Sequence, residues 1–397
     1  MNNTLKYIFL TFVFFSLFFL GSFHLGYLTM RNVATILLFI VALFMPRSNV
    51  KLDGVIKTFI VYLVVLFFCN LINGEIISER FIHITFAFLF PSAVSLFALP
   101  KFLRDKKDFL FVIGLVVILY IFNALVSYGQ YANNRFAWLI SSAIGYETPE
   151  KTGRFFLGSF IPGLTGDIVN NGYFLATFVP IAAMGILMKK KVWNIVGYFT
   201  LLFSGFCMYV VQQRMAFLCL ALFVVFLVLV KRDRVLVFSA VVVLFYVWFQ
   251  GNPLDSINTG RLDQTEDEGR MRLFAYFIEY VQSPDSFFGG INAYVKKYET
   301  VQHNSFTSAF VLGGVPTFIV FVVMFFKIVY NLFKTAISSM RSDPILCSLA
   351  VSCLIYVAYG MTHSSGLQND GLFFWISYAI LISYNKYIKK ETISSIV

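Results

Sequence analysis

Charged side chains are scarce in this sequence. Of its 397 residues only 13% are Asp, Glu, Lys or Arg, whereas 59% are hydrophobic. A soluble protein of average composition carries about 25% charged residues, so this shortage excludes an ordinary soluble domain. Acidic residues are the rarer kind, 20 against 31 basic residues, which leaves a net charge of +11.

Motifs of several common functional classes are also missing. The five cysteines all lie in apolar stretches and show no metal-ligand spacing, so we interpret them as small buried hydrophobic residues. The glycine-rich loops that hold nucleotide phosphates do not occur. No internal repeat is visible, and the two halves differ in loop length, which counts against a transporter built of two similar halves.

Apolar stretches of helical length occupy most of the chain. A transmembrane helix needs about 17 to 25 mostly apolar residues. Twelve such stretches are present, at approximately residues 7–23, 29–45, 55–72, 81–99, 109–126, 171–188, 192–211, 215–230, 235–249, 306–330, 344–361 and 371–385. We therefore predict an all-α integral membrane protein with about 12 transmembrane helices, in which residues 1–397 form a single polytopic membrane domain.

The basic residues gather in alternate loops. If the N-terminus is cytoplasmic, the inner segments hold 20 of the 31 basic and 6 of the 20 acidic residues, a net charge of +14. The outer segments then hold 11 basic and 14 acidic residues, a net charge of −3. This bias is the positive-inside rule and places both termini in the cytoplasm. The positive charge therefore reflects topology and contact with membrane lipid, and no nucleic-acid partner is expected.

Two connections are much longer than the others, at about residues 127–170 and 250–305, and both are external in this topology. Long connections are usually functional. The first mixes aromatic side chains with Gly, Asn and Arg154, which suits either sugar rings or the membrane interface. In the second, apolar residues recur at helical spacing from Met271 to Val281. We expect a short amphipathic helix there, on the outer surface with its apolar stripe in the membrane.

A single charged residue, Arg214, occurs in the 39 residues from 192 to 230. It stands at the expected tip of an external helical hairpin, after two glutamines. An arginine at such a rim either anchors the helix by reaching the lipid headgroups or offers its planar fork to an anion such as phosphate. Arg214 alone leaves both interpretations open.

All four histidines fall at or near outer helix ends in this topology. His24 and His83 have no polar neighbours in the sequence and are interpreted as interfacial residues. His303 stands between Gln302 and Asn304 at the start of an apolar stretch, and His363 lies in the polar turn GMTHSSGLQNDG. Histidine is the side chain most easily used as a base near neutral pH, although His303 taken alone favours a structural role.

Three segments in this order resemble the O-antigen ligase/polymerase superfamily of polytopic membrane glycosyltransferases. They are QQR at 212–214, EGRMRLF at 268–274 and HNSFTSAFVLGGVPTFIVF at 303–321. The family pattern carries over to Arg214, to Gly269-Arg270 and to His303-Asn304, and the pair Gly313-Gly314 also fits. Ligases often show H-x-H at this place, whereas Val301 stands at the earlier position here, which favours a polymerase.

The resemblance implies an active site that faces the periplasm, on the outer side of a bacterial inner membrane. The substrate would be an oligosaccharide linked through pyrophosphate to a polyprenol, and the product a surface polysaccharide such as O-antigen. Arg214 and Arg270 would stabilise the departing pyrophosphate, while His303 would take the proton of the attacking sugar hydroxyl or orient it. The candidates for substrate binding are Arg154, Asn304, Arg272 and His363. A chain-length regulator and a flippase would be partners.

Neither a cofactor nor a metal is expected for this reaction. The acidic run Glu266-Asp267-Glu268 is the densest in the chain, and we interpret it as a solvated helix start. Two alternative functions stay open: an O-antigen ligase that transfers polymer to lipid A-core, and a flippase or transporter of lipid-linked oligosaccharides. A transporter would need ionisable groups along a mid-membrane cavity, whereas the Arg and His residues here lie near outer helix ends.

Overall fold

The structure is a computed structural model that describes residues 2–21, 23–25, 28–46, 53–144, 161–166, 168–211, 214–231, 265–302, 304–361 and 371–394. Within these ranges the regular structure is helical apart from two short paired strands, β1 (His24–Leu25) and β2 (Leu28–Thr29). The α-helices are α1 (Asn3–Phe19), α2 (Met30–Phe44), α3 (Gly54–Ile72), α4 (Glu79–Ile84), α5 (Phe90–Phe102), α6 (Lys106–Tyr131), α7 (Arg135–Ala143), α9 (Ile168–Ala182), α10 (Lys191–Val211), α11 (Arg214–Lys231), α14 (Thr265–Gln282), α15 (Ile291–Tyr298), α16 (Ser305–Ser339), α17 (Pro344–Gly360) and α18 (Leu372–Ser394). Shorter helical turns are η1 (Glu75–Ile77), η2 (Thr85–Leu89), η3 (Met184–Leu187) and η4 (Pro284–Ser286).

Six helical segments in the described ranges are long and apolar enough to cross a membrane: Gly54–Ile72, Glu79–Phe102, Lys106–Tyr131, Val169–Leu187, Lys191–Val211 and Ser305–Ser339. Four shorter apolar helices accompany them: Asn3–Phe19, Met30–Phe44, Met215–Lys231 and Pro344–Gly360. Large apolar side chains are exposed along the bundle, such as Leu202 (72%) and Phe199 (70%) on α10. Such a surface is typical of contact with lipid. The described residues therefore form a predominantly helical bundle with the long apolar helices and apolar surface of a membrane protein.

The predicted apolar stretches agree with the helices wherever both can be compared. Eleven of the twelve coincide with helices that the structure describes. The remaining stretch, 235–249, lies outside the described residues.

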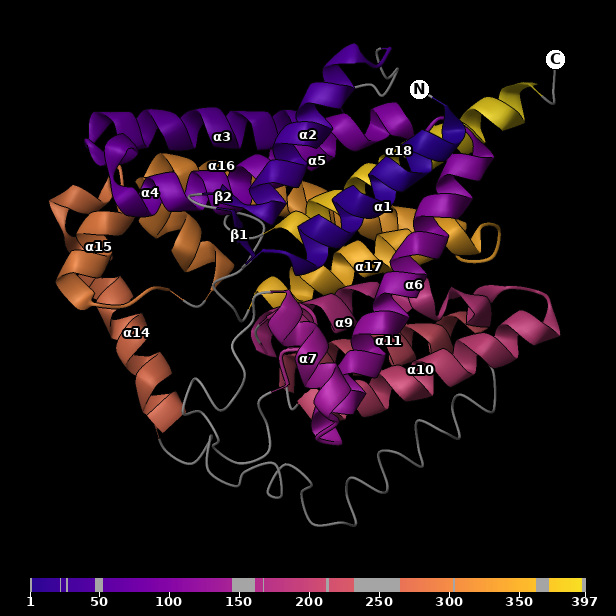
Figure 1. Cartoon of the computed structure of the whole chain (residues 1–397). Coiled ribbons are helices and arrows are strands. Elements are labelled where there is room, and N and C mark those ends of the chain that lie inside the picture. The colour runs from indigo at the N-terminus through magenta and orange to yellow at the C-terminus, as the bar shows by residue number, and fades with distance from the viewer. Residues whose placement is uncertain are drawn as a thin grey trace.

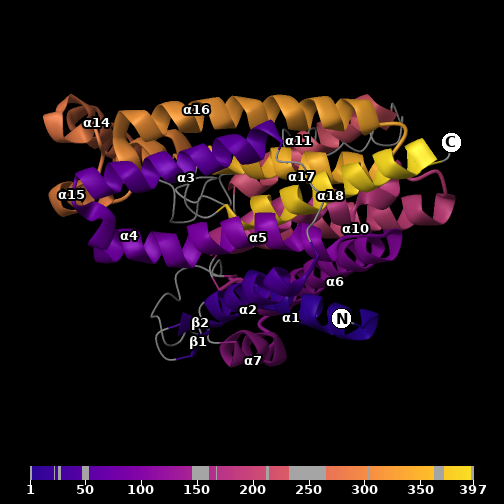
Figure 2. The same cartoon turned by 90° about the horizontal axis from the view of Figure 1, so that it is seen from above.

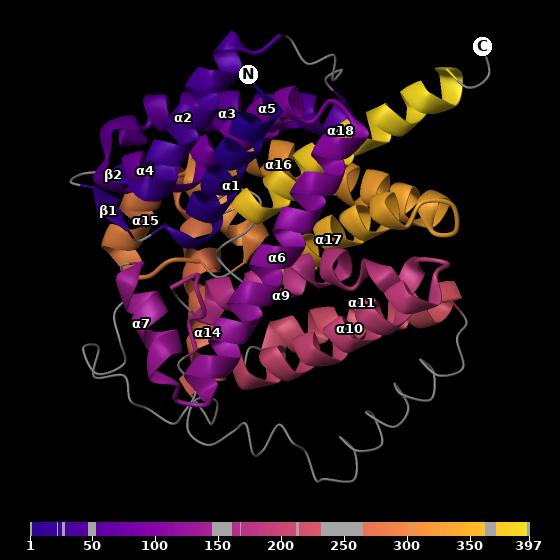
Figure 3. The same cartoon turned by 45° about the vertical axis from the view of Figure 1, so that its right-hand side comes forward.

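The helices pack around a core rich in aromatic rings. α16 lies against α3 and α17, α18 against α5 and α17, and α9 against α6, α10 and α17 (Figures 1 and 3). Where α1, α9 and α18 meet, the ring centroids of neighbouring side chains are 4.9–5.9 Å apart among Phe18, Phe174, Phe178 and Phe373. In lipid, close packing of this kind rather than the hydrophobic effect holds helices together.

The helix ends gather at two opposite ends of the bundle (Figure 2). We call one the basic end; it carries the starts of α1 and α6, the turn before α10, the end of α11 and the α16–α17 turn. There Lys101 Nζ donates to the carbonyl of Ala42 (2.8 Å) and Lys6 pairs with the buried Asp108. We call the other the groove end; it carries β1, β2, α4 and α15.

The helix α16 is interrupted close to the groove end. Gly313 and Gly314 leave the helical conformation, with φ −154° and ψ 21° at the first and φ 67° and ψ −159° at the second. A break in a membrane helix frees backbone N–H and C=O groups, which must find partners within the protein.

The loop Phe287–Gly290 supplies those partners. The amide of Gly290 donates to the carbonyl of Val311 (2.8 Å), and the amide of Val315 donates to the carbonyl of Phe287 (2.9 Å). From α3, Asn70 Nδ2 donates to the carbonyl of Leu312 (2.8 Å). We call this arrangement the glycine clasp, because it joins the loop Phe287–Gly290 to the pair Gly313-Gly314.

Candidate functional site

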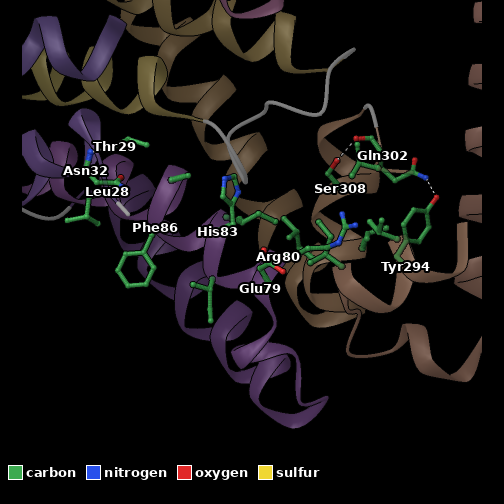
Figure 4. Close-up of a pocket in the computed structure, with 18 of the residues that line it drawn as sticks. Leu28, Thr29, Asn32, Glu79, Arg80, His83, Phe86, Tyr294, Gln302 and Ser308 are labelled. Atoms are coloured by element: carbon green, nitrogen blue, oxygen red, sulfur yellow. Dashed lines mark hydrogen bonds between the residues drawn. The ribbon is translucent and has the colours of Figure 1, made fainter. Parts of the chain in front are cut away.

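A cavity of about 950 Å³ lies at the groove end, between α4 on one side and α15 and α16 on the other (Figure 4). We call it the α4–α16 groove. Its polar side chains come from segments far apart in the sequence: His24, Thr29, Asn32, Glu79, Arg80, His83, Tyr294, Gln302 and Ser308. Apolar residues such as Phe86 and Val301 line the rest. A concave, mostly apolar site with a few convergent polar groups is the usual form of a binding site.

The helix α4 presents Arg80 and His83 to the groove. Its N-cap is Ser78, whose hydroxyl accepts from the amide of Phe81 (3.3 Å). Residues three apart share a helix face, which places the arginine and the histidine on one side while Phe81 is buried on another. The helix continues as a π-helical turn, Thr85–Leu89, which contributes Phe86 to the groove. π-Helical turns are frequent at functional sites.

The guanidinium of Arg80 has no hydrogen-bond or ion-pair partner among the residues that the structure describes. It extends from α4 toward the wall that carries Tyr294 and Gln302 (Figure 4). The adjacent Glu79 gives it no ion pair, since neighbours along a helix point in different directions. A planar fork held over a groove and left unpaired suits a phosphate or carboxylate, which it can bind through two bonds.

Both His24 and His83, which we interpreted as interfacial residues, line the groove. Arg80 lies one helical turn before His83, whereas Gln302 and Ser308 come from distant parts of the chain, which local sequence does not reveal. The ring of His83 lies edge-on to that of Phe88, with centroids 5.7 Å apart. His24 is held by the pairing of β1 with β2, in which it is opposite Thr29.

Two buried polar atoms on the β2–α2 side of the groove have no hydrogen-bond partner within the described ranges. They are Oδ1 of Asn32, a groove residue, and Nε of the adjacent Arg31. An unpaired buried polar atom is costly, so this side of the groove keeps polar atoms without protein partners, and Asn32 is the one of the two residues that lines the groove.

The opposite wall of the groove is fixed by Gln302. This side chain is 5% exposed; its amide donates to the carbonyl of Leu273 (3.2 Å) and to the hydroxyl oxygen of Tyr294. The backbone carbonyl of Gln302 accepts from the hydroxyl of Ser308 (3.2 Å). Burial raises the pKa of Tyr294, so its hydroxyl stays neutral at physiological pH. One glutamine therefore ties α14, α15 and α16 together beside the groove.

Asn304, which follows position 303 as Gln302 precedes it, is also fixed by hydrogen bonds. Asn304 is the N-cap of α16: its carboxamide oxygen accepts from the amide of Phe306 (2.8 Å). Its nitrogen donates to the carbonyl of Met361 (2.6 Å), and the hydroxyl of Ser305 donates to the carbonyl of Gly360. Asn304 therefore caps the start of α16. Its role in substrate binding stays a prediction, and both ends of its carboxamide are engaged in these bonds.

Two side chains before α4 connect the two walls. Glu75, which is 8% exposed, accepts from the amides of Asn292 (3.2 Å) and Ala293 (2.9 Å) at the start of α15. Asn73 donates to the carbonyl of Gly289 (2.7 Å) in the glycine clasp. A carboxylate at a helix N-terminus is favourable, so these bonds hold α15 at a set place relative to α4.

The predicted amphipathic helix is present as α14 and extends from Thr265 to Gln282. Two of its faces are apolar. One packs on the protein through Tyr280, which is 4% exposed, and Phe277. The other is exposed and carries Met271, Phe274, Ile278 and Val281. Phe277 falls within the apolar spacing from Met271 to Val281 that we expected to face the membrane, but it lies on the packed face, because α15 and α16 cover that side.

The structure places the other predicted site residues only in part. Arg214 is the first residue of α11 and Arg270 lies in the first half of α14, and their side-chain positions are not described. Arg272 is exposed on α14. His303, Arg154 and His363 lie outside the described residues.

Sequence reasoning missed Arg80 as a candidate. The available signal was its spacing from His83 in the segment ERFIH, an arginine and a histidine on one helix face. No group of three or more His, Cys, Asp or Glu side chains suited to a metal occurs in the part of the chain that is described. No protein family, no curated protein and no solved structure matches the chain in comparisons of sequence and structure.

Proposed function

We propose that this protein is a membrane glycosyltransferase that joins lipid-linked oligosaccharide repeat units into a surface polysaccharide, as an O-antigen polymerase does. The observation that carries the proposal is the α4–α16 groove, where an unpaired arginine and two histidines lie opposite the wall that Gln302 fixes. An anionic lipid-linked sugar needs this combination: a cation for the pyrophosphate, and a base beside the sugar.

The proposal includes a topology. All twelve apolar stretches cross the inner membrane of a bacterium, both termini are cytoplasmic, and the groove end faces the periplasm. The charge distribution of +14 against −3 supports this orientation. Cysteines introduced at Lys296 and at Lys190 test it, since the five native cysteines are buried. An impermeant thiol reagent added outside should label the first and spare the second; the opposite result would reverse the orientation.

The reaction is a transfer at the anomeric carbon. A terminal sugar hydroxyl of one unit attacks the anomeric carbon of another, the bond from that carbon to pyrophosphate breaks, and polyprenyl pyrophosphate leaves with the electron pair. His303 takes the hydroxyl proton, as the resemblance implies, and Arg214 and Arg270 act on the leaving group. We add Arg80 to them, because its fork is already unpaired in the groove. Fixed cations act on charge that develops in the transition state.

Substitution of Arg80 tests the proposal with purified protein and synthetic lipid-pyrophosphate oligosaccharide. Loss of one such donor costs about 10²–10³-fold in rate, so Arg80→Ala should lose most chain extension. Arg80→Lys should recover little, because an ammonium cannot make the two parallel bonds. The matched control is Arg135→Lys, an exposed arginine on α7. Extension by Arg80→Ala at the rate of the control would remove Arg80 from the mechanism.

His303 has its own test in the same assay. A general base contributes about 10²–10⁴-fold, so His303→Ala should abolish visible polymer while the protein still inserts in the membrane. Wild-type extension by this variant would make His303 an interfacial residue. Loss of wild-type activity with excess chelator would instead require a metal and bring the acidic run 266–268 back into consideration.

A ligase is the closest alternative, and the surface polysaccharide of a deletion strain distinguishes it. Loss of a polymerase leaves single repeat units on the lipid A-core. Loss of a ligase leaves bare core, with polymer retained on the carrier lipid. A flippase would leave neither polymer nor externally exposed units, and the purified protein would not extend chains.

A further inference from the structure

A second cavity, of about 630 Å³, opens at the basic end of the bundle, opposite the α4–α16 groove. We call it the basic pocket. Five segments converge on it: the start of α6, the turn from η3 to α10, the end of α11, the α16–α17 turn and the later part of α18. Its basic side chains are Lys106, Lys189, Lys231 and Arg341.

Three of these cations are free to bind an anion. Lys106, Lys189 and Arg341 have no hydrogen-bond or ion-pair partner among the residues that the structure describes, and all three are exposed. Lys231 differs, because its ammonium donates to Asn194 (3.1 Å) and lies over the ring of Tyr198. Like charges from separate segments repel one another, so their convergence favours a bound anion.

The one acidic residue of the basic pocket is engaged elsewhere. Asp343 is the N-cap of α17, where its carboxylate accepts from the amide of Leu346 (3.0 Å) and from the hydroxyl of Tyr384 (3.4 Å). Its single negative charge cannot balance the four cations around the cavity, so the pocket keeps an excess of positive charge.

The walls of the basic pocket and the adjoining helix surface are apolar. Leu187, Met188 and Ile345 line the cavity itself. Beside it, Val192 and Trp193 on α10 are 70% and 51% exposed, and Leu229 on α11 is 69% exposed. An exposed tryptophan at a helix end marks the headgroup level of a bilayer. A ligand here meets cations at the helix ends and apolar surface immediately along them.

We propose that the basic pocket binds the phosphate headgroup of an anionic phospholipid, with the acyl chains along the exposed surface of α10 and α11. Basic pockets between transmembrane helices at the cytoplasmic side suit such headgroups. A free phosphate would use the cations but not the apolar surface. Binding would link the α16–α17 turn to the start of α10. The site is independent of the glycosyltransferase activity proposed for the groove end.

The test compares two pairs of adjacent lysines. Lys106 and Lys189 line the basic pocket, whereas their neighbours Lys107 and Lys190 are exposed outside it. The double variant Lys106→Gln/Lys189→Gln and its control Lys107→Gln/Lys190→Gln thus lose the same charge at the same end of the protein. Both should unfold at the wild-type temperature in neutral detergent, because none of the four lysines makes an ion pair within the described structure.

Binding is measured by native mass spectrometry and by thermal unfolding in micelles doped with phosphatidylglycerol, with phosphatidylcholine, or with inorganic phosphate alone. We expect phosphatidylglycerol to stay bound and to raise the unfolding temperature. Affinity should fall about 30-fold in the pocket variant, from about 1 kcal/mol for each lysine, and little in the control. Equal losses in both variants, or equal effects of phosphatidylcholine, would refute the site. If inorganic phosphate raised the unfolding temperature as much as phosphatidylglycerol does, the pocket would bind free phosphate and the lipid assignment would be refuted.

Discussion

The glycine clasp predicts that Gly314→Ala severely destabilises the protein. Gly314 has φ 67° and ψ −159°, a conformation that essentially only glycine adopts, at a cost of about 1–3 kcal/mol for another residue. A Cβ there would also overlap the carbonyl oxygen of Phe287 and come within 2.5 Å of the amide nitrogen of Gly289. Overpacking of this kind costs about 1–3 kcal/mol more. The expected loss is therefore about 2–6 kcal/mol in the free energy of unfolding.

The matched control is Gly114→Ala. Gly114 lies in α6, and an added Cβ meets no atom within 4 Å. Since alanine favours a helix over glycine by about 1 kcal/mol, this variant should be as stable as the wild type or more so. Unfolding of the two purified variants is followed in detergent with increasing denaturant. If their free energies of unfolding differed by less than about 1 kcal/mol, the loop and α16 could accommodate a Cβ at Gly314 without strain, which would refute the reasoning.

Three further predictions concern the frame of the groove. Asn304→Ala removes the N-cap of α16 and should lose about 0.5–2 kcal/mol of unfolding free energy. Asn304→Asp should keep the cap but lose the bond to Met361. Equal stability of the wild type and both variants would exclude the cap. Glu75→Ala should speed hydrogen exchange of the Asn292 and Ala293 amides, which lose their acceptor, and unchanged exchange would contradict the link. The bond from Lys297 to Glu279 (2.9 Å) lowers the pKa of Glu279. The stability that this ion pair contributes is therefore fully present above pH of about 4.3, the pKa of a glutamate in the unfolded chain. It is lost as the pH falls through the lower pKa of Glu279 in the folded protein. The small stability difference between wild type and Glu279→Gln should therefore disappear in acid, where Glu279 is protonated, and be present at neutral pH.

The helices follow from local sequence, and so they could be predicted. A stretch such as 55–72 is continuously apolar and about long enough to cross a bilayer, and it forms α3 within one residue at its start. The same holds for Asn304, whose capping role depends only on the residues that follow it. The amphipathic helix α14 was predicted from its spacing, but its two apolar faces could not be separated. Which of them meets protein is decided by α15 and α16.

The groove depends on contacts that local sequence does not contain. Arg80 reaches the wall that carries Gln302, more than two hundred positions along the chain. That approach is set by the glycine clasp and by Glu75 on the start of α15. The polar side chains that share the groove with His83 but come from distant segments, such as Gln302, are therefore brought there by packing.

The clasp also explains why a helix long enough to cross a membrane is broken close to the groove. In an unbroken α16 the backbone carbonyls and amides would bond to one another within the helix. The loop Phe287–Gly290 would then find no hydrogen-bond partners in α16. The break instead lets α16 form two backbone hydrogen bonds with that loop. The loop directly precedes α15, so these bonds fix the position of α15. Tyr294 of α15 in turn accepts a hydrogen bond from Gln302 and fixes that side chain. Any displacement at Gly314 should therefore reach the residue before His303. If Gly314→Ala folds but its groove is shifted, chain extension should fall further than that of Asn304→Ala at matched stability. Equal activities would mean that the clasp supports the fold alone.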